Sequence, residues 1–228
     1  MNIVSPLETG TPLTMPHGRG ARLVISLFPR QLQGLVLQLR EDWRTHYFDW
    51  TQPGFRAVAA HRFGSWVDAE SGKGLVRGPI RSILRRLHLT MFRYVRNHYG
   101  IELPVTAIVG RRVLVGHQSG IVIHPHATIG DDCIIRQNVT IGALNTERDE
   151  APVVGRRVEL GAGATILGPV TIGDGARIGP HSVVMTDVPP GATVFVNPPR
   201  MISLRSVAPA NTVASAPALE SQAAGAAR

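Results

Sequence analysis

At 228 residues with 43% hydrophobic side chains, the chain is long enough for one packed domain and a smaller one. Its net charge of +8 favours anionic partners, but only 5% of its residues are aromatic and no nucleic-acid recognition motif is present, so we expect no nucleic-acid partner. A single cysteine, Cys133, excludes an internal disulfide and a multi-cysteine metal site, and it favours a reducing cytoplasm.

The first forty residues show no export or membrane segment. Residues 1–20 lack the apolar stretch of a signal peptide. The apolar run at 22–39 is divided by Pro29 and Arg30, and neither half reaches the roughly 20 residues of a membrane span. We therefore expect a cytoplasmic protein whose residues 1–21, rich in glycine, proline and threonine, form a disordered arm.

Residues 22–100 are expected to form an α-helical domain. Apolar residues at helical spacing predict one helix over 31–45 and a second over 79–99, with Pro79 in its first turn. The apolar stripe of the second helix consists of Ile80, Ile83, Leu84, Leu87, Met91, Phe92 and Val95. Its opposite face carries Arg77, Arg81, Arg85, Arg86, Arg93 and Arg96. Such a helix can make weak contact with a membrane surface or an anionic ligand, or its arginines can simply be solvated.

A period of six residues runs through residues 101–203. Aliphatic residues open each unit, in one run from Ile123 to Ile141 and another from Val154 to Val184, with two earlier units at Val109 and Val115. The fifth position is small or β-branched throughout, at Val113, Ser119, Ala127, Cys133, Val139, Val158, Ala164, Val170, Ala176, Ser182 and Val188. This pattern predicts a solenoid in which three units close one triangular coil and the coils stack on an aliphatic interior.

Two insertions interrupt the period, and solenoids place insertions on one face, often the binding face. The first adds two residues around Gly116-His117-Gln118-Ser119-Gly120, and the second is the loop from Gly142 to Val153. Beyond the solenoid, residues 204–228 are mostly alanine, serine, proline and valine and are expected to be a disordered tail.

The sequence resembles the serine acetyltransferase branch of the hexapeptide-repeat acyltransferases over roughly residues 40–202. The resemblance rests on the stretches at 53–62, 120–142, 161–164 and 187–190. It implies a mainly β fold, a left-handed parallel β-helix with an N-terminal helical domain, and a homotrimer with acetyl-CoA bound between neighbouring subunits.

The resemblance also implies roles for individual residues. His117 occupies the place of the family's catalytic histidine, and Glu102 that of the carboxylate which orients it. A histidine whose pKa is ordinarily near 6.5 suits removal of a hydroxyl proton at neutral pH. Asp42 matches an acidic residue that contacts the acceptor. The remaining expected cofactor-site residues are Gly142 and Ala143 near the oxyanion, and Gly161, Ala162, Gly179 and Arg200 along the acetyl-CoA groove.

Two departures from the family pattern bear on the acceptor. The aspartate before the catalytic histidine is Gly116, and the arginine-histidine pair of the long loop is Glu150-Ala151. Both groups would recognise the charged ends of an amino acid. We therefore expect an O-acetyltransferase that acts on the hydroxyl of a sugar or exopolysaccharide precursor, with L-serine as the alternative acceptor and cysteine biosynthesis as its context.

Two further readings stay open. His124, His126 and His181 invite comparison with zinc carbonic anhydrases of the same fold, but the partner position for His117 is Val122, so we expect no metal site. A structural trimer whose catalytic site has decayed is the non-enzymatic alternative, and the retained pair of His117 and Glu102 argues against it.

Overall fold

The computed structural model describes residues 30–70, 78–144 and 150–197. The predicted arm at 1–21, the tail at 204–228 and Arg200 lie outside these described residues. The helices are α2 (Arg30–Thr45), α3 (Pro53–Ala69) and α4 (Gly78–Tyr94), and a π-helical turn, η1 (Val95–Tyr99), continues α4 to the solenoid. No described helix is both long and apolar enough to span a membrane.

Fourteen short parallel strands follow in the described residues, and they form three sheets. Sheet A contains β1 (Ile101–Glu102), β4 (Ile121–Ile123), β7 (Thr140–Gly142), β10 (Thr165–Leu167) and β13 (Val183–Val184). Sheet B contains β2 (Ile108–Val109), β5 (Thr128–Ile129), β8 (Val153–Val154) and β11 (Thr171–Ile172). Sheet C contains β3 (Leu114–Val115), β6 (Ile134–Ile135), β9 (Glu159–Leu160), β12 (Arg177–Ile178) and β14 (Thr193–Val194).

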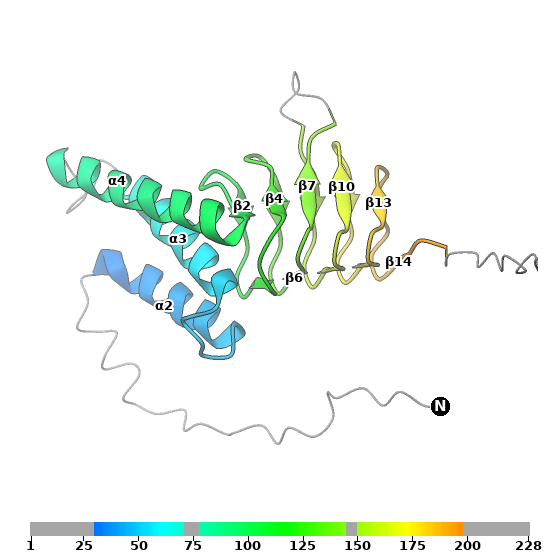
Figure 1. Cartoon of the computed structure of the whole chain (residues 1–228), viewed down its shortest axis with the longest axis horizontal. Helices are drawn as coiled ribbons and strands as arrows, with labels where there is room; N and C mark the ends of the chain where they lie inside the picture. The colour runs from blue at the N-terminus through cyan, green and yellow to red at the C-terminus, as the bar shows by residue number, and fades with distance from the viewer. Residues whose placement is uncertain (1–29, 71–77, 145–149, 198–228) are drawn as a thin grey trace, which may run out of the picture. The chain divides into compact units, whose positions relative to one another are not determined.

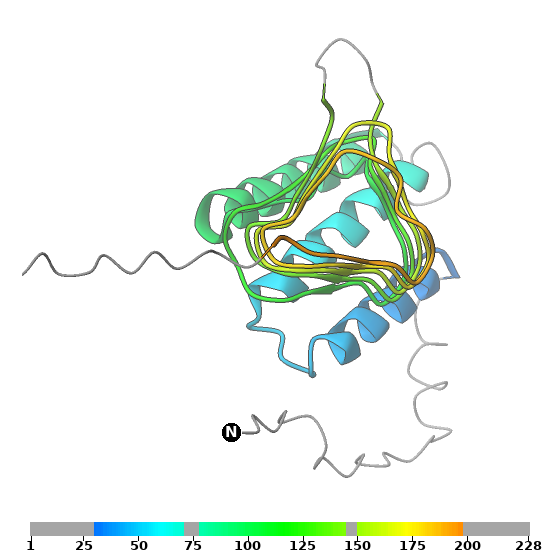
Figure 2. The ribbon, with the colours of Figure 1, turned by 90° about the vertical axis from the view of Figure 1, so that its right-hand side faces the viewer.

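Each of the first four coils contributes one strand to each sheet, and the last contributes β13 to sheet A and β14 to sheet C, so the coils stack as a parallel β-helix (Figure 1). Viewed along the stack, successive coils follow the same three-cornered path (Figure 2). The period of six arises because a two- or three-residue strand and its turn make one side of the triangle.

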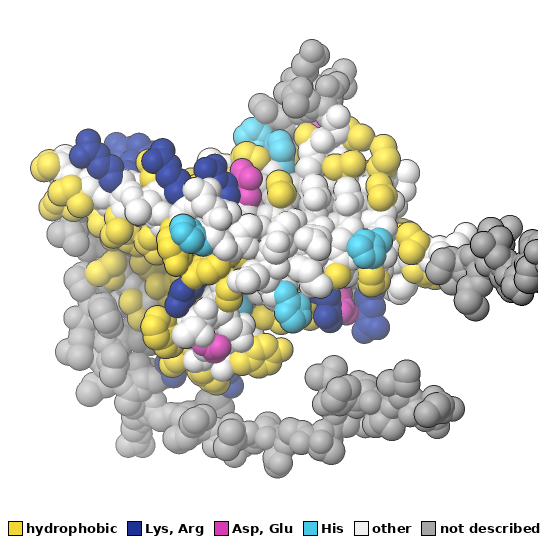
Figure 3. All heavy atoms as spheres, in the orientation of Figure 1, with side chains coloured by type: hydrophobic (Ala, Val, Ile, Leu, Met, Phe, Trp, Pro, Cys, Tyr) yellow, Lys and Arg dark blue, Asp and Glu magenta, His cyan; other side chains and the backbone are white. Residues whose placement is uncertain are grey.

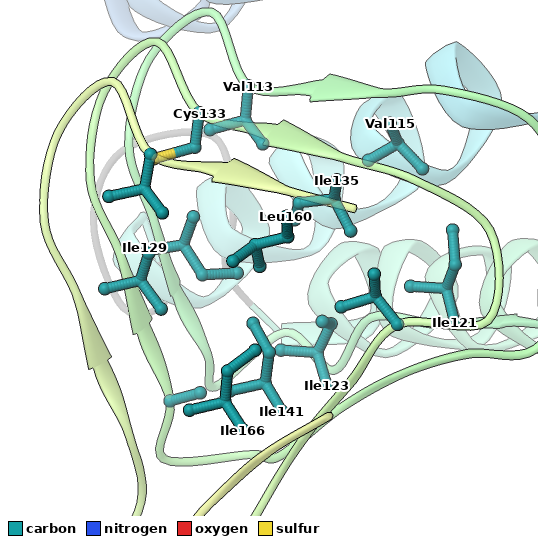
Figure 4. Packing of buried hydrophobic residues seen from close by; sticks show 14 of the residues in the cluster. Val113, Val115, Ile121, Ile123, Ile129, Cys133, Ile135, Ile141, Leu160 and Ile166 are labelled. Carbon is teal, nitrogen blue, oxygen red and sulfur yellow. The ribbon is translucent and has the colours of Figure 1, made fainter. Parts of the chain in front are cut away.

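The aliphatic residues that open the units fill the interior of the coils (Figure 4). Ile129, Ile141 and Ile166 are each at most 1% exposed, and the fifth-position residues Ala127 and Cys133 are fully buried. Ser119 is the exception among the predicted fifth positions, because it is exposed at a φ of 86° in the first insertion. The expectation of a stacked interior is therefore wrong at Ser119 and confirmed at the other fifth positions.

Helix α3 lies between the other helices and the solenoid and packs against both. Its buried residues include Gly54, Ala57, Ala60 and Gly64, whose small side chains allow close approach on more than one side. This explains why α3 shows little amphipathic periodicity, in contrast to α2 and α4.

Helix α4 packs with only part of its predicted apolar stripe. Val95 just beyond it is buried, whereas Ile80, Ile83 and Leu87 are 45%, 61% and 49% exposed. Figure 3 shows basic side chains gathered along the same helix, and the sequence of α4 identifies them as arginines. The apolar stripe of α4 is therefore wider than the surface of α3 that it contacts, and part of the stripe is exposed to solvent.

Polar side chains of the helical domain bond to the open end of the first coil. Strands β2 and β3 are the terminal strands of sheets B and C, so their outer backbone groups lack a strand partner. Arg62 donates to the carbonyl oxygens of Val109 (2.6 Å) and Gly110. The helices therefore cap the solenoid as a terminal repeat would.

Candidate active site

The first insertion forms an exposed loop at the corner between β3 and β4. Three residues of this loop adopt left-handed backbone conformations, with φ of 68° at His117, 86° at Ser119 and 67° at Gly120. His117 and Ser119 occupy a region that side chains other than glycine seldom adopt, so the surroundings must hold the loop in place. The N–H of Ser119 donates to Tyr99 O at 2.8 Å, and that of Ile121 donates to Gly100 O at 3.0 Å.

The same corner repeats in the following coils, and backbone hydrogen bonds stack one turn on the next. Asn138 N donates to Ser119 O, Gly163 N to Gln137 O, and His181 N to Ala162 O, each at 2.9 Å. The turns that carry Gly161, Ala162 and Gly179 therefore follow His117 in a row.

A groove of about 380 Å³ runs along this row of corners. Its lining comprises His117, Arg136, Gln137, Glu159, Gly161, Ala162, Arg177, Ile178, Gly179, Pro180 and Thr193. The structure thus brings together four of the residues predicted from the sequence: His117, Gly161, Ala162 and Gly179. Its lining combines charged and polar side chains with the glycine-containing corner turns, which suits an elongated ligand with anionic groups.

The charged residues of the groove lining are two arginines and one glutamate. Arg136 lies 3.2 Å from Glu159 in an exposed ion pair, and Arg177 is the register neighbour of Glu159 on the next strand. The Oε1 of Gln137 is buried and has no hydrogen-bond partner among the described residues. Two arginines and one glutamate therefore leave the groove lining with one net positive charge.

Sequence reasoning missed Arg136, Gln137 and Glu159 as groove residues, whereas Arg177 is among the arginines that the sequence offers for the phosphates of CoA. They occupy the outward positions of their hexads, next to the corner in each coil. Once the corner after β3 is identified as the site, counting forward through the hexads to the equivalent corners would have found them.

Glu102, the predicted partner of His117, lies on β1 at the edge of sheet A, paired in register with Val122. Its side chain is partly exposed and makes no hydrogen bond to His117 in the described part of the chain. Their relationship is set by the backbone, because the loop of His117 is bonded to Tyr99 and Gly100, just before Glu102. The pairing of the two side chains stays a prediction.

Gly142 and Ala143 lie away from this row. Gly142 ends β7, and its carbonyl oxygen accepts the N–H of Gly168 at 3.0 Å. Neither residue lines the groove. Their predicted role at the oxyanion is therefore not supported by proximity to His117 within one chain, and it stays a prediction for an assembly.

Asp42 is buried inside the helical domain at 1% exposure, where its carboxylate lies 2.9 Å from Arg62 Nε. The carboxylate of Asp42 therefore pairs with the same guanidinium group of Arg62 that donates hydrogen bonds to the first coil. In the described residues this carboxylate forms an ion pair with Arg62. The predicted contact of Asp42 with the acceptor therefore stays a prediction.

The histidines considered as zinc ligands do not gather into a metal-binding group. His124 and His126 lie with ring centroids 5.5 Å apart, and no three histidine, cysteine or acidic residues in the described ranges come together as ligands.

Comparison with known proteins gives two family matches within the solenoid. Residues 151–185 match the family described as bacterial transferase hexapeptide (six repeats), and residues 106–143 match the hexapeptide repeat of succinyl-transferase. Both matches fall on the coils that the period of six defines.

Two curated relatives are serine acetyltransferases. The chain is 34% identical over 158 residues to a serine acetyltransferase of Mycobacterium tuberculosis, covering 69% of this chain and 64% of that protein. It is 36% identical over 151 residues to the serine acetyltransferase of Synechococcus elongatus, covering 66% of this chain and 57% of that protein. The chain thus spans less than two thirds of the length of either relative.

Solved structures agree with this likeness. The soybean serine acetyltransferase apoenzyme superposes with a TM-score of 0.59 at 31% identity, covering 79% of this chain and 72% of that chain. Serine acetyltransferase isoform 3 of Entamoeba histolytica superposes with a TM-score of 0.61 at 22% identity, covering 76% and 62%, which bears on the fold alone. The predicted left-handed parallel β-helix with an N-terminal helical domain is confirmed.

Proposed function

We propose that this chain, which belongs to the serine acetyltransferase branch of the hexapeptide-repeat acyltransferases, transfers an acetyl group from acetyl-CoA to the hydroxyl of L-serine. The proposal rests on one observation above others: His117 stands at the head of a groove built from the same corner of successive coils. A basic side chain next to an elongated, partly cationic groove is the arrangement that a thioester of a phosphorylated carrier requires.

In the proposed reaction, the imidazole of His117 removes the proton of the acceptor hydroxyl. The resulting oxygen attacks the thioester carbonyl, and a tetrahedral oxyanion forms. Collapse of this intermediate breaks the carbon–sulfur bond, and the proton held on His117 can pass to the departing thiolate. Glu102 would orient the ring and stabilise the imidazolium. Arg177 and Arg136 would face the phosphate groups of the carrier.

L-serine as the acceptor differs from the sugar hydroxyl that the sequence led us to expect. The sugar acceptor was expected because Gly116 and Glu150-Ala151 depart from the family pattern. The relatives found are named serine acetyltransferases, and one soybean structure is described as complexed with serine. These names favour serine over a polysaccharide precursor, and the two departures would then be tolerated.

A homotrimer completes the proposal. His117 is exposed in the single chain. Acetyl transfer from a thioester is favoured when water is excluded from the general base, because water can otherwise react in place of the acceptor hydroxyl. A neighbouring subunit that covers the groove would supply this exclusion. Cytoplasmic location and weak membrane contact through α4 stay predictions, the latter from the exposed Ile83 and Leu87 beside the arginines.

The test is release of CoA thiol from acetyl-CoA by the purified protein, offered L-serine and then a panel of sugars. We expect release with L-serine, and we expect His117→Ala to lower kcat by about 100-fold or more, the usual contribution of a general base. His98→Ala is the matched control, since His98 is an exposed histidine outside the groove. Release of thiol with a sugar alone would support the sugar hydroxyl as the acceptor. No release with any acceptor would favour a structural trimer whose catalytic site has decayed.

A further inference from the structure

The backbone N–H of Val115 is an edge group of the solenoid. Its neighbours in the chain, Leu114 and Gly116, donate their N–H groups to Cys133 O and Ile135 O of the next coil, each at 2.8 Å. Because backbone groups alternate in direction along a strand, the N–H of Val115 points to the opposite side, where β3 has no neighbouring strand. His46 of the helical domain fills this place, with its Nε2 3.3 Å from Val115 N.

The hydrogen bonds of His46 define which ring nitrogen carries the proton. Its Nδ1 lies 2.7 Å from the carbonyl oxygen of Asp42, which can only accept, so Nδ1 carries the hydrogen. The neutral ring then offers a lone pair at Nε2, which accepts the N–H of Val115. His46 is fully buried, and burial lowers its pKa, which favours this neutral form.

Helix α3 restrains the same peptide group from its carbonyl side. A Cβ atom built on Gly54 would lie 1.9 Å from Val115 O, so the helix backbone at Gly54 rests directly on that carbonyl. The helical domain therefore holds both the N–H and the carbonyl of Val115, two residues before His117.

The other end of the loop is held by the segment that leaves α4. Tyr99 O accepts the N–H of Ser119, and a Cβ atom on Gly100 would lie 3.2 Å from Ser119 Cα. The loop that carries His117 is thus held at Val115 and at Ser119, in both cases by residues of the helical domain or of the segment that leaves α4. Between these two points His117 adopts a left-handed backbone conformation that residues other than glycine disfavour.

We propose that His46 is a positioning residue for His117: through the N–H of Val115 it fixes the strand end from which the catalytic loop departs. This inference rests on the proposed function only for its consequence in catalysis. The anchoring itself is a property of the loop and can be measured without any substrate.

Two amide substitutions separate the two hydrogen bonds of the ring. In His46→Gln, the side-chain oxygen reaches the place of Nε2 and can accept the N–H of Val115. In His46→Asn, the shorter amide reaches the place of Nδ1 and can donate to Asp42 O, but it leaves the N–H of Val115 without an acceptor. Both variants are polar, uncharged and close in size, so they differ mainly in which bond they keep.

Steady-state kinetics with acetyl-CoA and L-serine give the first test. We expect His46→Asn to lower kcat by about tenfold or more, since small displacements of a catalytic group carry costs of this order, with both KM values nearly unchanged. His46→Gln should retain most of the wild-type kcat. Equal losses in both variants, or wild-type kcat in His46→Asn, would overturn the proposal.

Amide hydrogen exchange, followed by mass spectrometry, gives the second test and needs no activity. In His46→Asn we expect faster exchange in peptides that cover residues 114–120, and unchanged exchange over 160–184, with His46→Gln resembling wild type. If the wild-type protein fails to acetylate serine, the proposed function falls while this exchange pattern still decides the anchoring. Unchanged exchange at 114–120 in His46→Asn, or uniformly faster exchange along the chain, would count against it.

Discussion

The carboxylate of Asp42 lies 2.9 Å from Arg62 Nε, and the two side chains are only 1% and 6% exposed. Through Arg62, this charge is linked to the edge carbonyls of the first coil at Val109 and Gly110. An acidic residue in α2 thereby fastens α3 to the solenoid.

Replacement of Asp42 by asparagine should destabilise the protein. Removing one partner of a buried pair leaves the other charge uncompensated, so we expect the free energy of unfolding to fall by roughly 3 kcal/mol, measured by urea denaturation. Asp68→Asn is the control, because Asp68 pairs with Arg85 on the surface and should change stability by less than about 1 kcal/mol. A raised KM for serine in fully folded Asp42→Asn would instead support the acceptor contact that the family resemblance implies.

Acid should weaken the protein before its carboxylates titrate. Burial, together with the nearby charge of Arg62, lowers the pKa of His61 from 6.5 to about 4, and burial also lowers the pKa of His46 and of His88. Between pH 6.5 and 4 the unfolded chain binds a proton at position 61 that the folded chain does not, so stability is full above pH 6.5 and falls as the pH decreases. The loss from His61 should reach about 3 kcal/mol at pH 4.

Urea denaturation at pH 7, 6 and 5 measures this dependence. His61 Nδ1 donates to Pro104 O at 3.1 Å, and asparagine can make the same bond without titrating. His61→Asn should therefore show a shallower decrease in stability over this range, and an identical slope would contradict the assignment.

Two glycine-to-alanine changes in helices should have opposite effects. At Gly54 in α3, the added methyl would meet Val115 O at 1.9 Å, so backbone must move and we expect a loss of about 2 kcal/mol or more. At Gly34 in α2, nothing lies within 4 Å of the added atom, and alanine should stabilise the helix by up to about 1 kcal/mol. Thermal denaturation of both variants measures the difference, and a stabilised Gly54→Ala would refute the close packing of α3.

The thiol of Cys133 should be inert while the solenoid is folded. The side chain is fully buried, its Sγ lies 3.0 Å from Gly155 O, and burial raises its pKa to about 11. Because the thiolate is the reactive form, a thiol reagent at pH 8 should label the native protein only at the rate of unfolding and label it rapidly in denaturant. Fast labelling of the native protein would show that this coil opens locally.

The solenoid could be predicted from the sequence because its interior requires an aliphatic or small side chain at the same positions of every six-residue unit. Interior residues such as Ala127 and Ile141 pack against residues of the same kind in the next coil, so the same sequence pattern recurs in every coil. The helical domain lacks this redundancy. The helix over 31–45 agrees closely with α2 and that over 79–99 with α4 and η1, but the position of α3 depends on small residues that face two partners at once.

The candidate site was only partly predictable for a related reason. His117 could be proposed because an insertion breaks the period there and the family resemblance implies a catalytic histidine at that place, and Gly161, Ala162 and Gly179 because the resemblance implies that acetyl-CoA lies along these corner turns. Arg136 stands at an outward position where the hexad accepts any residue, so only the stacking of corners identifies it, and the same stacking selects Arg177 from the arginines that the sequence offers for the phosphates of CoA. The pairing of Asp42 with Arg62 links residues twenty positions apart on different helices, which no local pattern encodes.

The row of stacked corners also sets a length scale. Neighbouring strands of a sheet lie about 4.8 Å apart, so the turns from His117 to Pro180 span roughly 14 Å in three steps. Deleting one coil beyond the catalytic corner would shorten this distance by a single step and leave the chemistry at His117 untouched. Repeat number thus offers evolution a discrete way to match the groove to donors of different reach, without altering the residues that react.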